Sequence, residues 1–260
     1  MRLTVVGCSG SFPGPSSPAS SYLLTADDAA GRTWRLVLDL GNGALGPLQR
    51  HTRITDVDAV LLSHLHPDHF LDLCGVYVAL RYDPDGEAPG RLPVWGPAGT
   101  ASRLAEAYGA PEGRGMGEQL DVREWVDGEP VRIGPFEVTP RRVLHPVPAF
   151  GLRVSGPGAD GEQRVLAYTG DTDDCPALDE LAGGVDLLLS EAAFHEGRDD
   201  VRGIHLTGRR AGQVAARAGV GRLVLTHLPP WNDPQRTLAE AAQTWTGPTE
   251  LAVPDAVLDV

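Results

Sequence analysis

Cysteine is scarce in this chain of 260 residues, which holds only Cys8, Cys74 and Cys175. Because their number is odd and they are widely spaced, the sequence argues against a disulfide framework. Apolar runs are also short, and none approaches the roughly 18 to 20 residues that a membrane-spanning helix needs. The first residues, MRLTVVG, have the pattern of a strand and not of a signal peptide. We therefore expect a cytoplasmic protein without a membrane partner.

Positive charge is scarce too. The chain has no lysine, and 22 basic residues face 35 acidic ones, which gives a formal net charge of −13. Nonspecific affinity for nucleic acid comes mostly from Lys and Arg side chains that neutralise phosphates. The charge therefore argues against a nucleic-acid partner.

Strand-like and helix-like segments alternate along the chain. The expected strands are residues 3–7, 21–25, 35–41, 58–63, 92–97, 121–126, 131–145, 150–155, 164–171, 185–191 and 222–227, and the expected helices are 70–82, 99–110, 207–219 and 234–245. Strand–helix repetition in both halves, with hairpin-like strands between them, indicates two packed sheets covered by helices. Residues 156–162 have the composition of a hairpin tip, so we expect one domain over residues 1–260.

A polar cluster follows the apolar run DAVLLS: His64, His66, Asp68 and His69 fall within six positions, although the chain has only 8 histidines. Burying four polar groups without partners costs several kcal/mol, so the cluster needs solvent or metal. His64 and His66 point the same way in an extended segment. Asp68 and His69, after a turn at Pro67, can reach a second point. Four such groups are too many for one tetrahedral ion with an open position, but they suit two adjacent ions.

Three further ligand candidates, His145, Asp171 and His227, each follow an apolar run. A strand there would deliver the side chain to a common edge of the fold. Taken singly, each has a plain alternative: a surface residue at a strand end, a turn former, or a residue at a helix N-terminus. Together with the complete cluster, the three favour a metal site.

The run SHLHPDH, followed by His145, TGDT and LTH, resembles the metallo-β-lactamase fold superfamily over nearly the whole chain. The resemblance implies a four-layer αβ/βα sandwich, with two mixed sheets flanked by helices, and a dinuclear site. We expect two divalent metal ions, with zinc favoured and manganese or iron as alternatives. By this resemblance, one ion is held by His64, His66 and His145, and the other by Asp68, His69 and His227. Asp171 bridges the two ions. The lactamases usually have cysteine or histidine in place of Asp171, which points instead to the phosphodiesterase, ribonuclease Z, glyoxalase II and lactonase branches.

The segment GIHLTGRRAGQVAARAGVGRLVLTH resembles ribonuclease Z and its relatives, where a His-Leu-Thr opens a helix about twenty residues before the last ligand. This resemblance implies that His205 donates a proton to the leaving oxygen and that Glu191 steadies it. The plain alternative makes His205 a neighbour of a helix cap and Glu191 a loop carboxylate. We count His205, Glu191 and Asp68 as the catalytic candidates. Asp39 either orients a metal-site residue by hydrogen bonding or forms a turn at a strand end.

The segment between His145 and Asp171 limits the range of possible substrates. Ribonuclease Z carries a long Gly/Pro-rich arm there that grips tRNA, whereas only 25 residues separate His145 from Asp171 here, and two strands fill most of them. The opening TVVGCSGSFPGPSSPASSYLL, with DLGNGALGPLQRH and LTHLPPW, resembles actinobacterial enzymes related to class II cyclic-nucleotide phosphodiesterases. That resemblance implies a homodimer that hydrolyses a small phosphodiester, a 3′,5′-cyclic nucleotide with cAMP favoured, by means of a metal-bridging hydroxide.

Several alternatives stay open at this point. The chain could be a tRNA 3′-processing endonuclease like ribonuclease Z, a lactonase-like hydrolase, or a non-catalytic or redox module that keeps the metals. The Gly/Ser-rich loop 7–14 either offers backbone N–H groups to a phosphate or is a tight turn. Phe12, Phe70 and Trp231 either stack on a base or pack in the core or rim.

Overall fold

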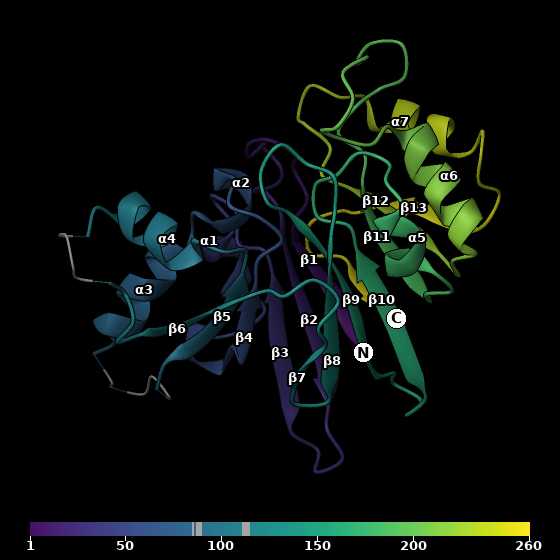
Figure 1. Cartoon of the computed structure of the whole chain (residues 1–260). Coiled ribbons are helices and arrows are strands. Elements are labelled where there is room, and N and C mark those ends of the chain that lie inside the picture. The colour runs from purple at the N-terminus through teal and green to yellow at the C-terminus, as the bar shows by residue number, and fades with distance from the viewer. Residues whose placement is uncertain (85, 87–89, 111–114) are drawn as a thin grey trace.

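The structure is a computed structural model that describes residues 1–84, 86, 90–110 and 115–260. Two sheets of seven strands pack face to face, and helices cover the outer side of each (Figure 1). This arrangement is the four-layer αβ/βα sandwich expected from the sequence, and it confirms that prediction of the fold class.

The first sheet has the strand order β14-β1-β2-β3-β4-β5-β6. Its strands are β1 (Arg2–Gly7), β2 (Ser21–Asp27), β3 (Thr33–Leu38), β4 (Ala59–Leu61), β5 (Leu92–Gly96), β6 (Leu120–Glu124) and β14 (Val257–Asp259). The second sheet has the order β13-β12-β11-β10-β9-β8-β7. Its strands are β7 (Val131–Ile133), β8 (Phe136–Arg142), β9 (Phe150–Pro157), β10 (Gln163–Tyr168), β11 (Leu187–Glu191), β12 (Leu223–Thr226) and β13 (Thr249–Leu251).

Both sheets are mixed in the same way. In the first, β14, β1, β2 and β3 pair antiparallel, and β3 to β6 pair parallel. In the second, β7 to β10 pair antiparallel, and β10 to β13 pair parallel. The carboxyl ends of parallel strands meet at one edge, so each sheet gathers several loops at the same end of the sandwich.

Alternate residues of the central strands face different layers, as the strand period of two requires. In β3, Leu36 and Leu38 belong to the core between the sheets, while Val37 belongs to the core under the helices. In β11, Leu189 faces the core between the sheets and Leu188 faces the helices of the second half. Strands buried on both faces need continuous apolar runs, and these runs are what the sequence showed.

The helices are short and lie on the outer faces (Figure 1). The first half carries α1 (Leu45–Leu48), α2 (Pro67–Phe70), α3 (Leu73–Arg81), α4 (Thr100–Tyr108) and the 3₁₀ turn η1 (Ile54–Asp56); the second carries α5 (Ala177–Ala182), α6 (Gly208–Ala218) and α7 (Pro234–Ala241). The ends of α6 follow from its sequence. The Oγ1 atom of Thr207 accepts a hydrogen bond from Arg210 N at the start, and Gly219 ends the helix with a φ of 64°.

Some expected boundaries were wrong. The expected strand 131–145 is two strands, because Gly134, at φ 56°, turns the chain between β7 and β8, and β8 ends at Arg142. The expected helix 70–82 is replaced by α2 and α3, which are separated at Leu71 and Asp72. The strands β13 and β14 were not anticipated from the sequence. The hairpin tip at 156–162 is confirmed by the pairing of Pro157 with Gln163.

Two expectations from composition can be compared with the structure. All three cysteines are free, so they form no disulfide. Among the described residues, none of the helices has the length and apolar character needed to cross a membrane.

Candidate metal centre and catalytic residues

The predicted site residues gather at the end of the sandwich where loops leave the parallel strands. Seven residues converge there from helix α2 and from the loops after β4, β8, β10 and β12: His64, His66, Asp68, His69, His145, Asp171 and His227. His227 takes a φ of 57°, and Asp39, at the end of β3, takes a φ of 54°. Such values are strained for residues other than glycine, and they concentrate at sites where the backbone must aim a side chain.

The first group of donors is formed by His64, His66, His145 and Asp171. Nδ1 of His66 lies 3.0 Å from Nε2 of His64 and 3.2 Å from Nε2 of His145. Oδ2 of Asp171 lies 3.7 Å from Nε2 of His64. Donors about 2.0–2.1 Å from a tetrahedral ion lie about 3.3 Å from one another. The first group therefore has the spacing of ligands around a divalent ion.

The second group is formed by Asp68, His69, His227 and again Asp171. Nε2 of His69 lies 3.5 Å from Oδ2 of Asp68 and 3.3 Å from Oδ2 of Asp171. Nε2 of His227 lies 3.7 Å and 3.2 Å from the same two oxygens. Oδ2 of Asp171 belongs to both groups, which is the position that a bridging ligand needs.

Three histidines of the site are held through Nδ1, so that Nε2 faces the centre. Nδ1 of His69 lies 2.7 Å from Oδ2 of Asp39, and Nδ1 of His227 lies 2.9 Å from Oγ of Ser20. Nδ1 of His145 lies 2.9 Å from the carbonyl oxygen of Ile204. A partner on Nδ1 selects the tautomer and leaves Nε2 free as a metal ligand.

Unpaired atoms in the second group favour a cation in the same place. Nε2 of His69 and Oδ1 of Asp171 are buried and have no hydrogen-bond partner in the structure. A buried polar atom without a partner costs about 1–3 kcal/mol. Coordination would satisfy Nε2 of His69, which faces two carboxylates that can share an ion with it.

The charges of the site point the same way. Burial, together with the neighbouring imidazole of His69, lowers the pKa of His64 well below its ordinary value. Burial alone would raise the pKa of Asp171, but the imidazoles of His227, His69 and His64 hold it well below its usual range. Neutral imidazole and ionised carboxylate are the forms that bind metal. Burial would also lower the pKa of His69, yet the carboxylates of Asp171, Asp39 and Asp68 raise it well above normal, and the same negative field favours a cation.

His205 and Glu191 form a hydrogen-bonded pair beside this centre. Nδ1 of His205 lies 2.8 Å from Oε1 of Glu191 and 4.0 Å from Oδ2 of Asp171. Glu191, at the end of β11, is fully buried, and its two oxygens accept the N–H groups of Thr172 and Ala193 at 2.8 and 3.0 Å. Burial alone would lower the pKa of His205, but the Glu191 carboxylate more than offsets it and raises this pKa to about 9. Glu191 therefore favours the protonated form of this imidazole.

Asp39 follows β3 and contacts a metal-site residue, His69, which is the first of the two roles considered from the sequence. Its carboxylate accepts hydrogen bonds from the N–H and Oγ of Ser63 and from the hydroxyl of Tyr168, each at 2.7 Å, besides its contact with His69. Asp39 thus ties the histidine cluster after β4 to the end of β10. Ser63, Tyr168 and Ser20 were not anticipated from the sequence.

Asp173 was also missed. Its buried carboxylate accepts hydrogen bonds from Gly203 N at 2.7 Å and Arg202 Nε at 2.8 Å, and it forms an ion pair with Arg210 of α6. Its backbone N–H donates to Leu144 O at 2.9 Å. Asp173 therefore joins the segments that carry Asp171, His145 and His205. The sequence TGDTDD does contain a second acidic residue two positions after Asp171, but it does not indicate which residues that carboxylate would bind.

The Gly/Ser-rich loop is a tight turn. The N–H groups of Ser9, Gly10 and Phe12 donate to backbone carbonyls within the protein, and that of Cys8 donates to Oγ of Ser17. The N–H of Ser11 instead faces Nε2 of His227 at 3.4 Å. The structure thus favours the turn over a phosphate cradle for this loop.

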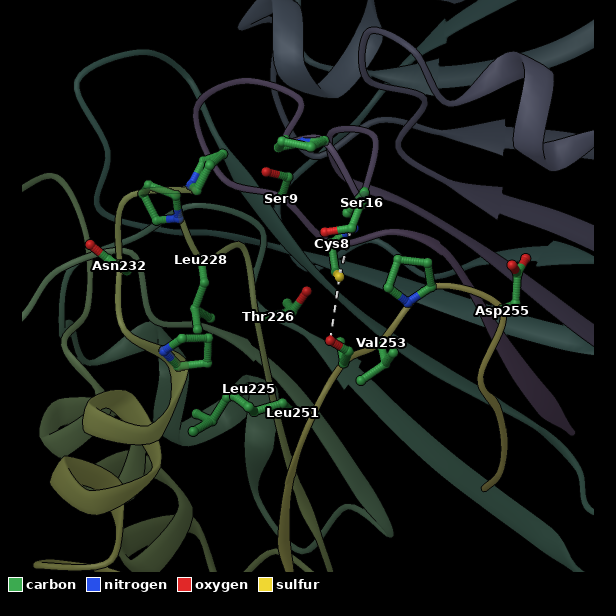
Figure 2. Close-up of a pocket in the computed structure, with 18 residues that line it drawn as sticks. Cys8, Ser9, Ser16, Leu225, Thr226, Leu228, Asn232, Leu251, Val253 and Asp255 are labelled. Carbon is green, nitrogen blue, oxygen red and sulfur yellow. Dashed lines mark hydrogen bonds between the residues drawn. The ribbon is translucent and has the colours of Figure 1, made fainter.

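Two cavities adjoin the loop that carries His227. One, of about 270 Å³, is bordered by His205 and includes Phe194, Arg198, Asp199 and Trp231 in its lining. The other, of about 520 Å³, lies between loop 8–17, the segment 225–234 and the segment 251–255, and Sγ of Cys8 donates across it to Ala252 O at 3.3 Å (Figure 2). The seven predicted ligands, all of them described residues, line neither cavity, and His205 is the predicted site residue that borders the first.

Comparison with known proteins agrees with this architecture. The family described as "Beta-lactamase superfamily domain" matches residues 34–228. An uncharacterized protein of Mycobacterium tuberculosis is 45% identical over 263 residues, covering 100% of this chain and 92% of its own length. Ribonuclease Z of Mycobacterium marinum is 32% identical over 260 residues, with 88% and 87% covered. The crystal structure of the metallo-β-lactamase fold protein YhfI from Bacillus subtilis matches with a TM-score of 0.86 and 27% identity, covering 100% of this chain and 99% of that one.

Proposed function

Because the chain belongs to the β-lactamase superfamily and has the fold of its metal-dependent hydrolases, we propose that it is a phosphodiesterase that hydrolyses a 3′,5′-cyclic nucleotide, with cAMP as the favoured substrate. Its relatives carry names of metallo-hydrolase and ribonuclease Z type, which support hydrolysis but do not select this substrate. A cytoplasmic location, expected from the sequence, stays a prediction.

The proposal includes two divalent ions, with zinc favoured over manganese and iron. Asp171 would bridge them, with one group of three ligands on each side. When bound, such a pair supplies a water whose pKa falls from about 15.7 toward roughly 7, and positive charge next to the phosphate oxygens. The residues of the chain hold this pair through nitrogens whose tautomers are set by Asp39, Ser20 and the carbonyl of Ile204.

The main support for this reaction is the pairing of His205 with Glu191, because it provides a proton donor for a leaving oxygen that becomes negatively charged. Since Nδ1 of His205 is engaged by Glu191, Nε2 is the nitrogen available to give a proton. The imidazole lines the 270 Å³ cavity, and its Nδ1 lies 4.0 Å from Oδ2 of Asp171, so this one side chain adjoins both the cavity and the centre. Protonation of the leaving oxygen by such a group is worth about 10²–10⁴-fold in rate.

The size and charge of the site favour a small substrate. A cavity of about 270 Å³ is close to the lower end of the roughly 300–1,000 Å³ of small-molecule sites. Between His145 and Asp171 the chain forms β9, β10 and their hairpin, and these described residues do not form an arm that could hold tRNA. The net charge of −13 also opposes a polyanionic partner.

A tRNA-processing endonuclease is the second candidate, because the relative from Mycobacterium marinum is a ribonuclease Z at 32% identity. A lactonase-like hydrolase and a non-catalytic metal-binding module would share the same centre. The hydrolase alternatives differ in the bond that they cleave, and the non-catalytic module cleaves none, so a substrate panel separates them.

The test is a panel of cAMP, cGMP, bis-p-nitrophenyl phosphate, pre-tRNA and a lactone with metal-loaded protein, using the Asp171→Ala variant as the background. We expect turnover of cAMP to a nucleoside monophosphate. Cleavage of pre-tRNA or the lactone with no turnover of either cyclic nucleotide would replace the proposal by the corresponding alternative. No turnover of any substrate would favour the non-catalytic module.

A further inference from the structure

Two large aromatic side chains stay exposed beside the cavity that His205 borders. Trp231 is 64% exposed and Phe12 is 38% exposed, whereas Phe70, the third aromatic singled out in the sequence, is buried in the core at 1%. The rings of Trp231 and Phe12 contact each other, with centroids 4.9 Å apart and an angle of 44° between their planes. They come from the loops that follow β12 and β1, so the fold brings together two aromatics that are remote in sequence.

The indole of Trp231 is held on a rigid turn. Pro229 and Pro230 precede it, and the N–H of Asn232 donates to Pro229 O at 2.8 Å, which closes the turn. The Asn232 side chain donates to Ala193 O and accepts from Arg198, both at 2.8 Å. Asn232 itself is only 8% exposed. The exposed ring therefore follows a turn that the buried Asn232 holds in place, so little backbone conformational entropy would be lost when a ligand covers the ring.

Trp231 lines the same cavity as the acid candidate His205. Phe194 also lines this cavity, with its ring 4.9 Å from that of His205 and at 77° to it. The one guanidinium of the lining belongs to Arg198, whose Nε lies 2.9 and 3.1 Å from the two oxygens of Asp199. This pairing neutralises the guanidinium, so the part of the cavity away from His205 is aromatic and nearly neutral and does not favour a second phosphate.

We propose that this cavity is the leaving-group subsite and that it takes the nucleobase of the substrate, stacked on Trp231 with Phe12 behind it. The inference rests on the proposed function: His205 protonates the leaving oxygen from the cavity, so the nucleoside that bears this oxygen lies in the cavity. Base–aromatic stacking is tolerant of base identity and is worth about 1–3 kcal/mol per base, or roughly 5- to 150-fold in affinity. Adenine and guanine nucleotides are both accepted by such a subsite.

The experiment compares two ligands that share a phosphate and differ in the base. Metal-loaded protein is titrated calorimetrically with AMP and with ribose 5-phosphate. Wild-type protein binds AMP roughly 5- to 150-fold more tightly, and Trp231→Ala brings this ratio close to one while leaving the affinity for ribose 5-phosphate unchanged. Trp231→Phe keeps most of the ratio, because the ring remains. Tyr82→Ala is the matched control, since Tyr82 is 66% exposed at the end of α3 and lies outside the cavity.

Turnover of cAMP by the same samples separates this inference from the proposed function. If wild type hydrolyses cAMP and Trp231→Ala keeps the wild-type preference for AMP, the stacking subsite is wrong and the phosphodiesterase proposal stands. If wild type hydrolyses no cyclic nucleotide, yet prefers AMP and loses this preference in Trp231→Ala, the subsite is supported and the proposed reaction is wrong. A wild-type protein that binds ribose 5-phosphate as tightly as AMP overturns the subsite directly.

Discussion

Oδ2 of Asp39 lies 2.7 Å from Nδ1 of His69, and neither side chain is accessible to solvent. The contact joins the end of β3 to the turn after β4. It leaves Nε2 of His69 facing the carboxylates of Asp68 and Asp171. A residue that touches no substrate therefore decides which nitrogen of this histidine is offered to the centre.

The first prediction concerns this contact. Asp39→Asn keeps the size of the side chain but removes the charge that holds His69, so we expect metal affinity to fall about 10- to 100-fold. Competition with a chromophoric chelator measures it, and circular dichroism checks the fold. Asp58→Asn is the control, because Asp58 also accepts a backbone N–H, from Arg35, but at the opposite end of β4. An affinity equal to that of wild type would make Asp39 only a turn former.

The second prediction concerns the bridge. Purified wild-type protein should carry about two divalent ions per chain, and Asp171→Ala should lose both metal occupancy and activity, because its Oδ2 belongs to both donor groups. Elemental analysis by mass spectrometry after gel filtration gives the occupancy. Asp174→Ala, which removes a carboxylate paired with Arg217 near the surface, should keep both ions. Two ions retained in Asp171→Ala would exclude Asp171 as the bridge.

The third prediction concerns Asp173. Asp173→Asn removes the nearest carboxylate of the buried Arg210 guanidinium and leaves only the more exposed Glu196, with Oε1 3.7 Å from Nε; breaking a buried pair costs about 3–5 kcal/mol. For a chain of this size we expect the Tm to fall by roughly 6–20 °C. The double variant with Arg210→Gln should lose less, because the unpaired charge is also gone. A double variant whose loss equals the sum of the two single losses would show that the pair has no coupling.

The grouping of the candidate ligands could be predicted because its members carry local signals. His64, His66, Asp68 and His69 lie within six positions directly after an apolar run, a pattern that is typical of metal ligands. His145, Asp171 and His227 each follow an apolar run, and the end of such a run is visible in the sequence. The layers were predictable for the same reason, since a strand such as β11, with Leu187 to Leu189 buried on both faces, reads as a continuous apolar run.

The supporting residues could not be predicted, because their roles depend on partners from other parts of the chain. Ser20 acts on His227 from 207 positions away, and Tyr168 donates to Asp39 from 129 positions away. Serine and tyrosine are common, and nothing local distinguishes these two from their neighbours. The edge strands β13 and β14, three residues each, were missed because so short a pairing leaves no periodicity in the sequence.

The fourth prediction is a homodimer, which the family resemblance implies. Analytical ultracentrifugation at micromolar concentration should show a species of about twice the chain mass of 27.6 kDa. The metal-loaded protein should be used, so that an unfolded or aggregated fraction does not enter the result. A single species at the chain mass would contradict the prediction.

The last prediction tests the role of His205. His205→Ala should keep its metals, because His205 is not one of the seven proposed ligands and its Nδ1 is engaged by Glu191, but it should lose about 10²–10⁴-fold in kcat on cAMP. The loss should be much smaller on bis-p-nitrophenyl phosphate, because nitrophenolate departs with little protonation. The benefit of a general acid grows with the basicity of the departing oxygen, so the contrast between the substrates reports the proton transfer itself. A structural histidine would depress both substrates equally, and equal losses with intact metals would retire the assignment. Glu191→Gln should give a weaker form of the same contrast, since Glu191 only orients the imidazole and favours its charged form. Its carboxylate also accepts the N–H groups of Thr172 and Ala193, so the metal content and thermal stability of this variant are measured alongside its rates.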